Sequence, residues 1–229
     1  KVLHWIRMHR ILLLLSLTIY EMPHSPYCIP LKRALDAFAI PHERVPVPNW
    51  DRGKIMALTD GAYYQVPVLA HDEALIYETS DSSLDVAHYV DEQFASGQLF
   101  PSTTTGINEI LIEHIENEIE GLTFRLCDIH YVPLIDDVVA RTSVIRHKER
   151  RFGRDCLEGW KTRAPEIRAD LYRLSGRFDA TLQSRGCILQ DNAPTYVDYA
   201  LLGVIENLTY GGHETLAPDH TALRAWQER

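Results

Sequence analysis

Short apolar runs dominate the first part of the chain. Residues 12–20 (LLLLSLTIY) form one such run that closes in Thr, Ile and Tyr, which predicts a buried strand. The turn EMPHSP follows, with Ser25 at a favourable N-cap position and Pro26 at the first helical position. Apolar residues then recur on one face of the predicted helix: Leu31, Ala34, Leu35 and Phe38. The sequence therefore predicts a strand, a turn and an amphipathic helix.

A second set of short segments follows this helix. Residues 40–47 indicate an extended segment, and residues 50–61 a short polar helix or loop. The apolar runs 66–69 and 74–77 flank a His-Asp-Glu turn, which predicts a hairpin. Residues 82–94 then carry apolar positions at helical spacing. This order of elements predicts a compact α/β unit.

Helical periodicity dominates the rest of the chain, and no strand-like alternation returns. The predicted helices cover residues 107–126, 135–152, 167–185 and 195–210. Gly186 has the position of a C-terminal glycine, and Thr195 and Asp198 have the spacing of a capping box. We therefore expect an α/β domain and an all-helical domain. Their predicted bounds are residues 12–95 and 104–229, with a linker near 96–104 and an extension of uncertain origin at 1–11.

Composition and charge narrow the function classes. The chain has 229 residues, of which 45% are apolar, so it can bury a substantial core. Its formal net charge of −9 argues against a broad nucleic-acid interface, which needs a basic surface. The most basic run, residues 146–154 (RHKERRFGR), is predicted to be a solvated helix face.

The N-terminal segment and the cysteines also bear on the surroundings of the protein. Residues 1–19 resemble a signal peptide, but no small-residue cleavage site follows them, so a buried strand is favoured. Their apolar run is about nine residues, far below the roughly 20 that span a bilayer, so no membrane partner is expected. The four cysteines lie far apart, without metal-ligand spacing, which predicts reduced thiols and no metal site. They are Cys28, Cys127, Cys156 and Cys187.

Ser25-Pro26-Tyr27-Cys28 is the first candidate for chemistry, because it lies where a strand gives way to a helix. Free N–H groups and a partial positive charge at a helix N-terminus stabilise an anion such as a thiolate. Cys28 is one candidate, as the reactive thiol. Ser25 is the other, as a hydrogen-bond donor to the thiolate of a bound substrate. The stretch is also compatible with a plain N-cap and a small apolar filler.

Two further features lie downstream. In QVPVL, a cis Val66–Pro67 bond would leave the backbone of Val66 free to pair with an extended ligand. The stretch ETSDSS, residues 78–83, places acids and hydroxyls just before a helix. It is either an ordinary cap or a site that holds a ligand's carboxylate and ammonium groups.

The order and spacing of these features resemble the glutathione S-transferase superfamily. The stretches LTIYEMPHSPYC and LKRAL are similar to the first strand and helix of its thioredoxin-like domain, and YYQVPVL is similar to its cis-proline segment. SLDVAHYVDEQF resembles the helix that follows, and ILQDNAPTYVDYALLG the capping-box motif of its helical domain. The resemblance runs from about residue 16 to Trp226, so a thioredoxin-like domain followed by a helical bundle is expected.

The resemblance implies that the residue at the start of the first helix activates the thiol of glutathione. That residue is Ser25 here, which implies a serine-type transferase and argues against efficient disulfide exchange. Cys28 stands at the position of a second, resolving cysteine but lacks a partner at Ser25. Tyr20 is a minor alternative activator.

The other contacts to glutathione are also implied by the resemblance. The backbone of Val66, beside a cis Pro67, would pair with the cysteinyl part. Lys54 or Arg52 would approach the glycyl carboxylate.

The γ-glutamyl group would meet an acid and a hydroxyl before the next helix. Counting back from that helix favours Asp81, Ser82 and Ser83. The common form of the motif, with the pair soon after the hairpin, fits Glu78 and Thr79 instead.

A glutathione transferase acting on a hydrophobic electrophile is thus the leading hypothesis, with Phe124, His130 and Tyr131 as candidates for the second substrate site. A glutathione-dependent lyase or thiol-transferase using Cys28 is the second hypothesis. A non-catalytic binding protein of the same fold is the third. The family implies a cytoplasmic homodimer with a role in detoxification and with glutathione as co-substrate. The sequence features described above add the expectation of no metal and of no nucleic-acid or membrane partner.

Overall fold

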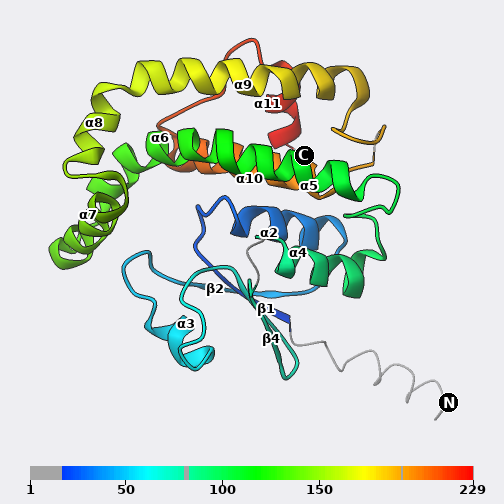
Figure 1. The fold of residues 1–229 in the computed structure, drawn as a ribbon, viewed down its shortest axis with the longest axis horizontal. Helices are drawn as coiled ribbons and strands as arrows, with labels where there is room; N and C mark the ends of the chain where they lie inside the picture. Colours follow the sequence, from blue (N-terminus) through cyan, green and yellow to red (C-terminus); the bar gives the residue numbers. More distant parts are fainter. Residues whose placement is uncertain (1–16, 80–82, 192, 229) are drawn as a thin grey trace.

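The computed structural model describes residues 17–79, 83–191 and 193–228. A sheet with its own helices forms one layer, and a larger set of helices packs above it (Figure 1). The fold class expected from the sequence, α/β followed by all-helical, is confirmed. The extension at residues 1–11 and the first part of the predicted strand, residues 12–16, lie outside the described residues.

A four-stranded mixed sheet organises the first layer. Its strands are β1 (Leu17–Glu21), β2 (Glu43–Pro46), β3 (Val68–His71) and β4 (Ala74–Ile76). Their order is β2-β1-β3-β4, with β1 and β2 parallel and the other neighbours antiparallel. The predicted hairpin is confirmed, but β3 begins two residues later than expected. Pro67 lacks the N–H group that a ladder would need at that point.

Three helices and a π-helical turn accompany the sheet. They are α2 (Cys28–Ala37), α3 (Gly53–Leu58), α4 (Asp85–Val90) and the turn η1 (Asp91–Ala95). Helices α2 and α4 lie between the sheet and the upper helices, whereas α3 lies on the side away from them (Figure 1). The start of α2 therefore faces the boundary between the two layers.

The turn that opens α2 differs in detail from the prediction. We expected Ser25 as N-cap and Pro26 as first helical residue, whereas α2 begins at Cys28 with Tyr27 as N-cap. The carbonyl of Ser25 nevertheless accepts a hydrogen bond from the amide of Ile29 at 3.0 Å, which is the i to i+4 pattern of a helix. The predicted apolar face is confirmed by burial of Leu31, Ala34 and Leu35 and by the packing of Phe38 against them.

Helices make up the regular structure of the second layer in the residues described. They are α5 (Thr105–His114), η2 (Ile115–Glu120), α6 (Gly121–Tyr131), η3 (Val132–Leu134), α7 (Val138–Phe152), α8 (Cys156–Thr162), α9 (Ala164–Arg185), α10 (Tyr196–Thr209), η4 (Tyr210–Gly212) and α11 (Thr221–Gln227). The placement of the domain boundary within 96–104 stays a prediction.

Several helices begin or end at other residues than the sequence periodicity predicts. The helix predicted at 107–126 falls within a longer helical segment, in which α5, the π-helical turn η2 and α6 follow one another without a gap. Helix α7 begins only at Val138, because the carboxylate of Asp137 accepts the amide hydrogen of Ala140 at 2.7 Å and caps the helix. Helices α8 and α11 were not predicted, since seven residues are too few for a clear period.

The predicted signals at the end of α9 and the start of α10 are confirmed. Gly186 ends α9 in the left-handed region at φ 81°. Thr195 and Asp198 form the capping box, in which Asp198 accepts the amide hydrogen of Thr195 at 2.9 Å. The other oxygen of Asp198 accepts from the amide of Ile188 at 2.7 Å, so one buried carboxylate joins the loop before α10 to its first turn.

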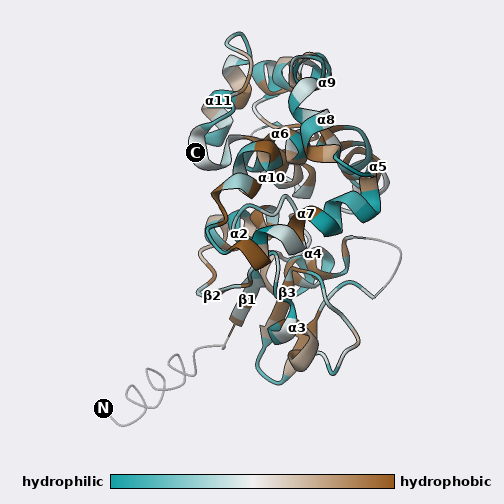
Figure 2. Cartoon of the chain, turned by 90° about the vertical axis from the view of Figure 1, so that its left-hand side faces the viewer, coloured by the Kyte–Doolittle hydropathy of each residue, from teal (hydrophilic) through white to brown (hydrophobic). Residues whose placement is uncertain are grey.

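Helix α10 forms the centre of the core. Nearly all of its side chains are buried, and it packs on α2, α5 and α6. In Figure 2 apolar segments gather along α10 and α2, whereas the outer helix α9 is largely polar. The apolar character of α10 thus reflects burial inside the protein. In the described part of the chain, no helix is both long and apolar enough to cross a membrane.

Gly203 brings α10 into direct contact with the turn that opens α2. A Cβ atom at this position would lie 2.4 Å from the carbonyl oxygen of Pro26 and 2.6 Å from Cγ of Pro30. One turn further along, Asn207 donates a hydrogen bond from Nδ2 to the carbonyl of His24 at 2.7 Å. The second layer therefore holds the residues on both sides of Ser25.

Gly203→Ala should destabilise the protein by about 1–3 kcal/mol, because the added methyl group overlaps a backbone oxygen that cannot move independently. Chemical denaturation measures this difference in the free energy of unfolding. Gly159→Ala in α8 is the matched control, since a Cβ there meets nothing within 4 Å. Equal stability of the Gly203 and Gly159 variants would contradict the proposed close contact.

Candidate active site

A cavity of about 920 Å³ lies between the sheet domain and the upper helices. This volume is near the top of the range of about 300–1,000 Å³ that is usual for ligand pockets. Its walls come from the turn before α2, the loops on either side of α3, the segment before α4, and helices η2, α6, α7 and α10. The cavity can therefore hold a sizeable ligand or two smaller ones.

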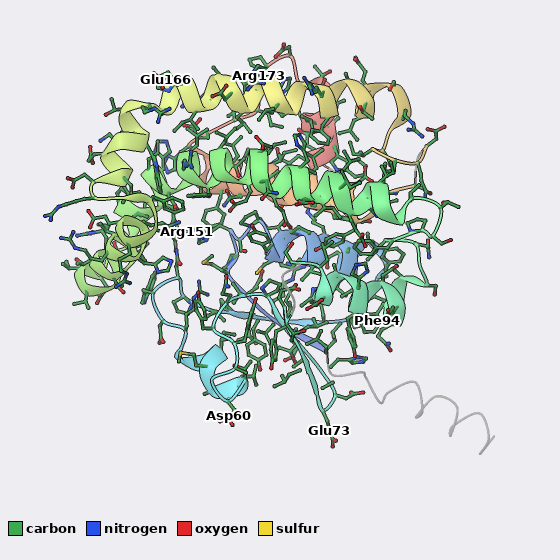
Figure 3. All side chains as sticks on the ribbon, in the orientation of Figure 1. Asp60, Glu73, Phe94, Arg151, Glu166 and Arg173 are labelled. Atoms are coloured by element: carbon green, nitrogen blue, oxygen red, sulfur yellow. The ribbon has the colours of Figure 1, made fainter. Side chains whose placement is uncertain are left out.

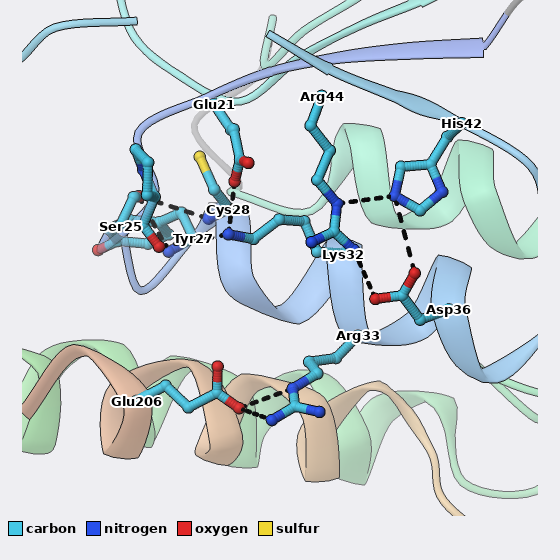
Figure 4. Close-up of polar contacts among 11 residues, drawn as sticks. Glu21, Ser25, Tyr27, Cys28, Lys32, Arg33, Asp36, His42, Arg44 and Glu206 are labelled. Carbon is cyan, nitrogen blue, oxygen red and sulfur yellow. Dashed lines mark hydrogen bonds and ion pairs between the residues drawn. The ribbon is translucent and has the colours of Figure 1, made fainter. Parts of the chain in front are cut away.

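Ser25 lines the cavity at the start of α2. Its Oγ accepts hydrogen bonds from the amides of Tyr27 at 3.3 Å and Cys28 at 3.4 Å, as Figure 4 shows. Because a hydroxyl oxygen bonded in this way still carries its own hydrogen, Ser25 can donate it to an acceptor. The side chain is 3% exposed, so a partner in the cavity would be shielded from most solvent.

Lys32 links the turn that contains Ser25 to strand β1. Its Nζ forms an ion pair with Glu21 at 2.5 Å and donates to the carbonyl of Pro23 at 3.2 Å. Figure 4 shows this ion pair beside the Ser25 turn, with Arg33 reaching to Glu206 of α10. Side chains of α2 thus tie the turn to β1 and α10.

Cys28 points away from the cavity. Its side chain is fully buried in a small apolar cluster with Val47, Ile55, Val66 and Val68. Burial raises the pKa of the Cys28 thiol to about 11, although a hydrogen bond from Ser25 opposes this rise. Cys28 is therefore a neutral, packed thiol.

His24 and Arg52 flank Ser25 in the cavity wall. The His24 ring packs on Tyr131 with centroids 4.2 Å apart, and burial, followed by nearby cations, lowers the His24 pKa to about 4. His24 is therefore neutral at pH 7. Arg52 donates to Asn49 at 3.4 Å, but its buried Nη1 has no hydrogen-bond partner among the described residues. A ligand acceptor in the cavity could satisfy this donor.

The Val66–Pro67 peptide bond is cis, as expected from the sequence, and both residues line the cavity. They directly precede β3, whose pairing partner β1 leads into the Ser25 turn. The sheet therefore places this segment and Ser25 in the same wall.

Acidic groups form a second wall near α4. Glu78 accepts backbone hydrogen bonds from Asp85 at 2.7 Å and Val86 at 3.5 Å, and burial raises its pKa to about 7. The Ser83 hydroxyl donates to the carboxylate of Glu116 at 2.6–2.7 Å. Glu78, Ser83 and Glu116 all line the cavity.

The end of α7 forms a basic wall. His147, Lys148, Arg150 and Arg151 line the cavity together with Phe152. The predicted solvated face of residues 146–154 is confirmed by the exposure of His147, Arg150 and Arg151, although these residues also border the cavity. Helical periodicity alone did not show that this part of α7 borders the cavity.

Comparison with known proteins identifies the domain around this site. Residues 19–98 match the family model of the glutathione S-transferase N-terminal domain. This part of the chain is a glutathione S-transferase domain. The superfamily inferred from the sequence is thereby confirmed. The comparison with curated proteins found no match.

Solved glutathione transferase structures share the fold of nearly the whole chain. GSTFuA3 from Phanerochaete chrysosporium superposes with a TM-score of 0.76 at 15% identity, covering 94% of this chain and 96% of that one. A glutathione S-transferase from Rhodospirillum rubrum gives 0.67 at 15% identity, covering 93% and 86%. The glutathione-bound theta class enzyme of Xanthomonas axonopodis pv. citri gives 0.61 at 15% identity, covering 94% and 92%. At these identities the likeness establishes the fold.

Within this glutathione S-transferase domain, the predicted glutathione contacts fall into two groups. Ser25, Val66, Pro67, Glu78 and Ser83 line one cavity. The others do not join them in the described part of the structure: exposed Thr79 bonds to Asp85, Lys54 lies with Tyr20 at a separate hollow, and Asp81 and Ser82 lie outside the described residues.

Of the candidates for the second substrate site, one lines the cavity and two do not. Phe124 lines the cavity. Tyr131 packs against His24, and half-buried His130 lies 3.4 Å from Glu214 and stacks on His213; neither residue lines the cavity. Sequence reasoning did not single out Glu116 or the α7 wall. The basic run 146–154 was the one available signal for that wall.

Proposed function

We propose that the protein is a glutathione transferase that stabilises the thiolate of glutathione and presents it to an electrophile. The observation that carries this proposal is the Ser25 hydroxyl, held in the cavity wall by two backbone amides at the start of α2. Its hydroxyl hydrogen can rotate about the Cβ–Oγ bond and be donated to a sulfur anion in the cavity, and the helix N-terminus adds a favourable field.

The reaction needs a proton to leave the glutathione thiol and a new bond to form. The thiol proton passes to solvent, and the thiolate accepts a hydrogen bond from Ser25. The sulfur then attacks the electrophilic carbon of the second substrate, a sulfur–carbon bond forms, and the leaving group departs with its electron pair. Stabilising the thiolate raises the fraction of the reactive form at neutral pH.

The cavity suggests where the rest of glutathione binds. The backbone of Val66 is assigned to the cysteinyl part, and Glu78 with Ser83 to the γ-glutamyl group. Arg52 replaces Lys54 as our candidate for the glycyl carboxylate, because Arg52 lines the cavity with an unpaired buried Nη1 and Lys54 does not line it. These assignments place the glutathione sulfur beside Ser25.

The alternatives receive less support. A lyase or thiol-transferase using Cys28 needs an accessible thiolate, whereas Cys28 is fully buried with its pKa raised to about 11. A non-catalytic binding protein would not need a free hydroxyl donor at the helix start. The homodimer, the cytoplasmic location and the role in detoxification stay predictions from the family.

Ser25→Ala should lower kcat with a generic aryl halide by about 10- to 100-fold, because the thiolate loses its hydrogen-bond donor. The KM for glutathione should change little, since most binding contacts remain. Steady-state kinetics with both substrates varied measure the two effects separately.

Cys28→Ser is the discriminating variant, and Ser184→Ala, on the exposed side of α9, is the surface control. We expect both to keep the kcat of the wild type when assayed in the folded state. Full activity in Ser25→Ala together with its loss in Cys28→Ser would instead support chemistry at Cys28.

The affinity for the γ-glutamyl ammonium group should rise between pH 6 and pH 8. Burial raises the Glu78 pKa to about 7, so the carboxylate that attracts the ammonium forms across this interval as protons leave. Calorimetric titration with S-methylglutathione measures this without interference from a titrating thiol.

Glu78→Gln should remove the rise, while the amide oxygen keeps an acceptor for the backbone of α4. Glu120→Gln is the matched control, because burial also raises the Glu120 pKa to about 7 and Glu120 lines the same cavity, but from the end of η2 rather than from the segment before α4. A rise that persists in Glu78→Gln and vanishes in Glu120→Gln would refute the assignment of Glu78.

A further inference from the structure

The end of α7 brings several cations to the cavity of a protein whose net charge is −9. His147, Lys148, Arg150 and Arg151 all lie in this wall. Basic residues in the last turn of a helix are common, because they complement its dipole. That preference does not require them to line a ligand cavity.

Two of the four cations have no free charge for a ligand. Lys148 forms an ion pair with buried Asp128 and lies over the Phe124 ring at 4.8 Å. Burial and the neighbouring cations lower the His147 pKa below its usual value, so this imidazole is mostly neutral at pH 7. The two arginines are left as the available charges.

Arg150 and Arg151 form no ion pair within 4 Å with a carboxylate in the described part of the chain, unlike nearby Arg146, which pairs with Glu149. The guanidinium of Arg151 lies 5.1 Å from the centroid of the Phe152 ring. Figure 3 shows Arg151 where the end of α7 faces the sheet domain. A planar cation next to an aromatic ring favours a flat anionic ligand.

Tyr27 connects this wall to Ser25. The Tyr27 amide donates to Ser25 Oγ, and its side chain lines the cavity. Burial raises the Tyr27 pKa, with the charges of Glu120 and Glu116 adding to the rise and that of Arg151 opposing it. The phenol is therefore within electrostatic reach of Arg151, and both side chains line the same cavity.

We propose that the second substrate is a flat, anionic electrophile, such as an aryl carboxylate, whose negative group pairs with Arg151. The inference rests on the proposed transferase function and names the substrate class of the same cavity. The ring of the substrate then lies along Tyr27 and Phe124, with its electrophilic carbon toward the glutathione sulfur at Ser25. The acidic wall at Glu78 and Glu116 disfavours the reversed orientation.

Paired electrophiles test this assignment. We compare kcat/KM, at saturating glutathione, for a neutral chlorodinitrobenzene and for a chlorodinitrobenzoate, which differ by one carboxylate. Arg151→Gln should lower kcat/KM for the benzoate by about tenfold, the size of one charge-assisted contact, and change the neutral substrate by less than about twofold. Added salt should weaken the benzoate reaction of the wild type more than the neutral reaction.

Arg154→Gln is the matched control, since it removes a positive charge three residues after Arg151. The Arg154 side chain is exposed and does not line the cavity. Arg154→Gln should leave kcat/KM unchanged for both substrates. An equal loss for both electrophiles in Arg151→Gln, or no loss for either, would overturn the inference.

Failure of the proposed transferase function gives a different result, in which the wild type turns over neither electrophile. Binding then provides the test: displacement of fluorescent anilinonaphthalenesulfonate by the chlorodinitrobenzoate, in glutathione-saturated protein. Weakening by about tenfold in Arg151→Gln but not in Arg154→Gln would support the anionic site without catalysis. Equal displacement in all three proteins would overturn it.

Discussion

The contact between α10 and the turn that opens α2 is the constraint on which the rest of the site depends. At Gly203 there is no space for a side chain, because the Pro26 carbonyl lies against the helix. Asn207 holds the next carbonyl along the turn, that of His24. Ser25 sits between these two contacts, so its position is set by the helical domain as much as by its own strand and helix.

The same arrangement gives the cavity its uneven charge. The sheet domain contributes Glu78, the helical domain contributes Glu116 close to it, and α7 contributes Arg151 on the other wall. Ser25 lines the same cavity as these groups. Glutathione, with its ammonium group, and an anionic electrophile would therefore each bind in a defined orientation, with the sulfur of glutathione between them.

Local signals explain what the sequence could predict. The SPYC turn, the cis Val66–Pro67 bond and the Thr195–Asp198 capping box each depend on a few neighbouring residues, and each is found in the structure. Other features depend on distant contacts. Arg52 lines the cavity whereas Lys54, inside α3, does not, and the α7 wall depends on how that helix packs. Periodicity carries no information on these contacts.

The central claim is that Ser25 lowers the thiol pKa of bound glutathione. The most direct measurement is the ultraviolet difference spectrum of the glutathione thiolate in the binary complex, followed as a function of pH for the wild type and for Ser25→Ala. We expect a thiol pKa well below that of free glutathione in the wild type, and a return toward the free value in the variant. A bound thiol that titrates like free glutathione in the wild type, or identically in both proteins, would contradict it.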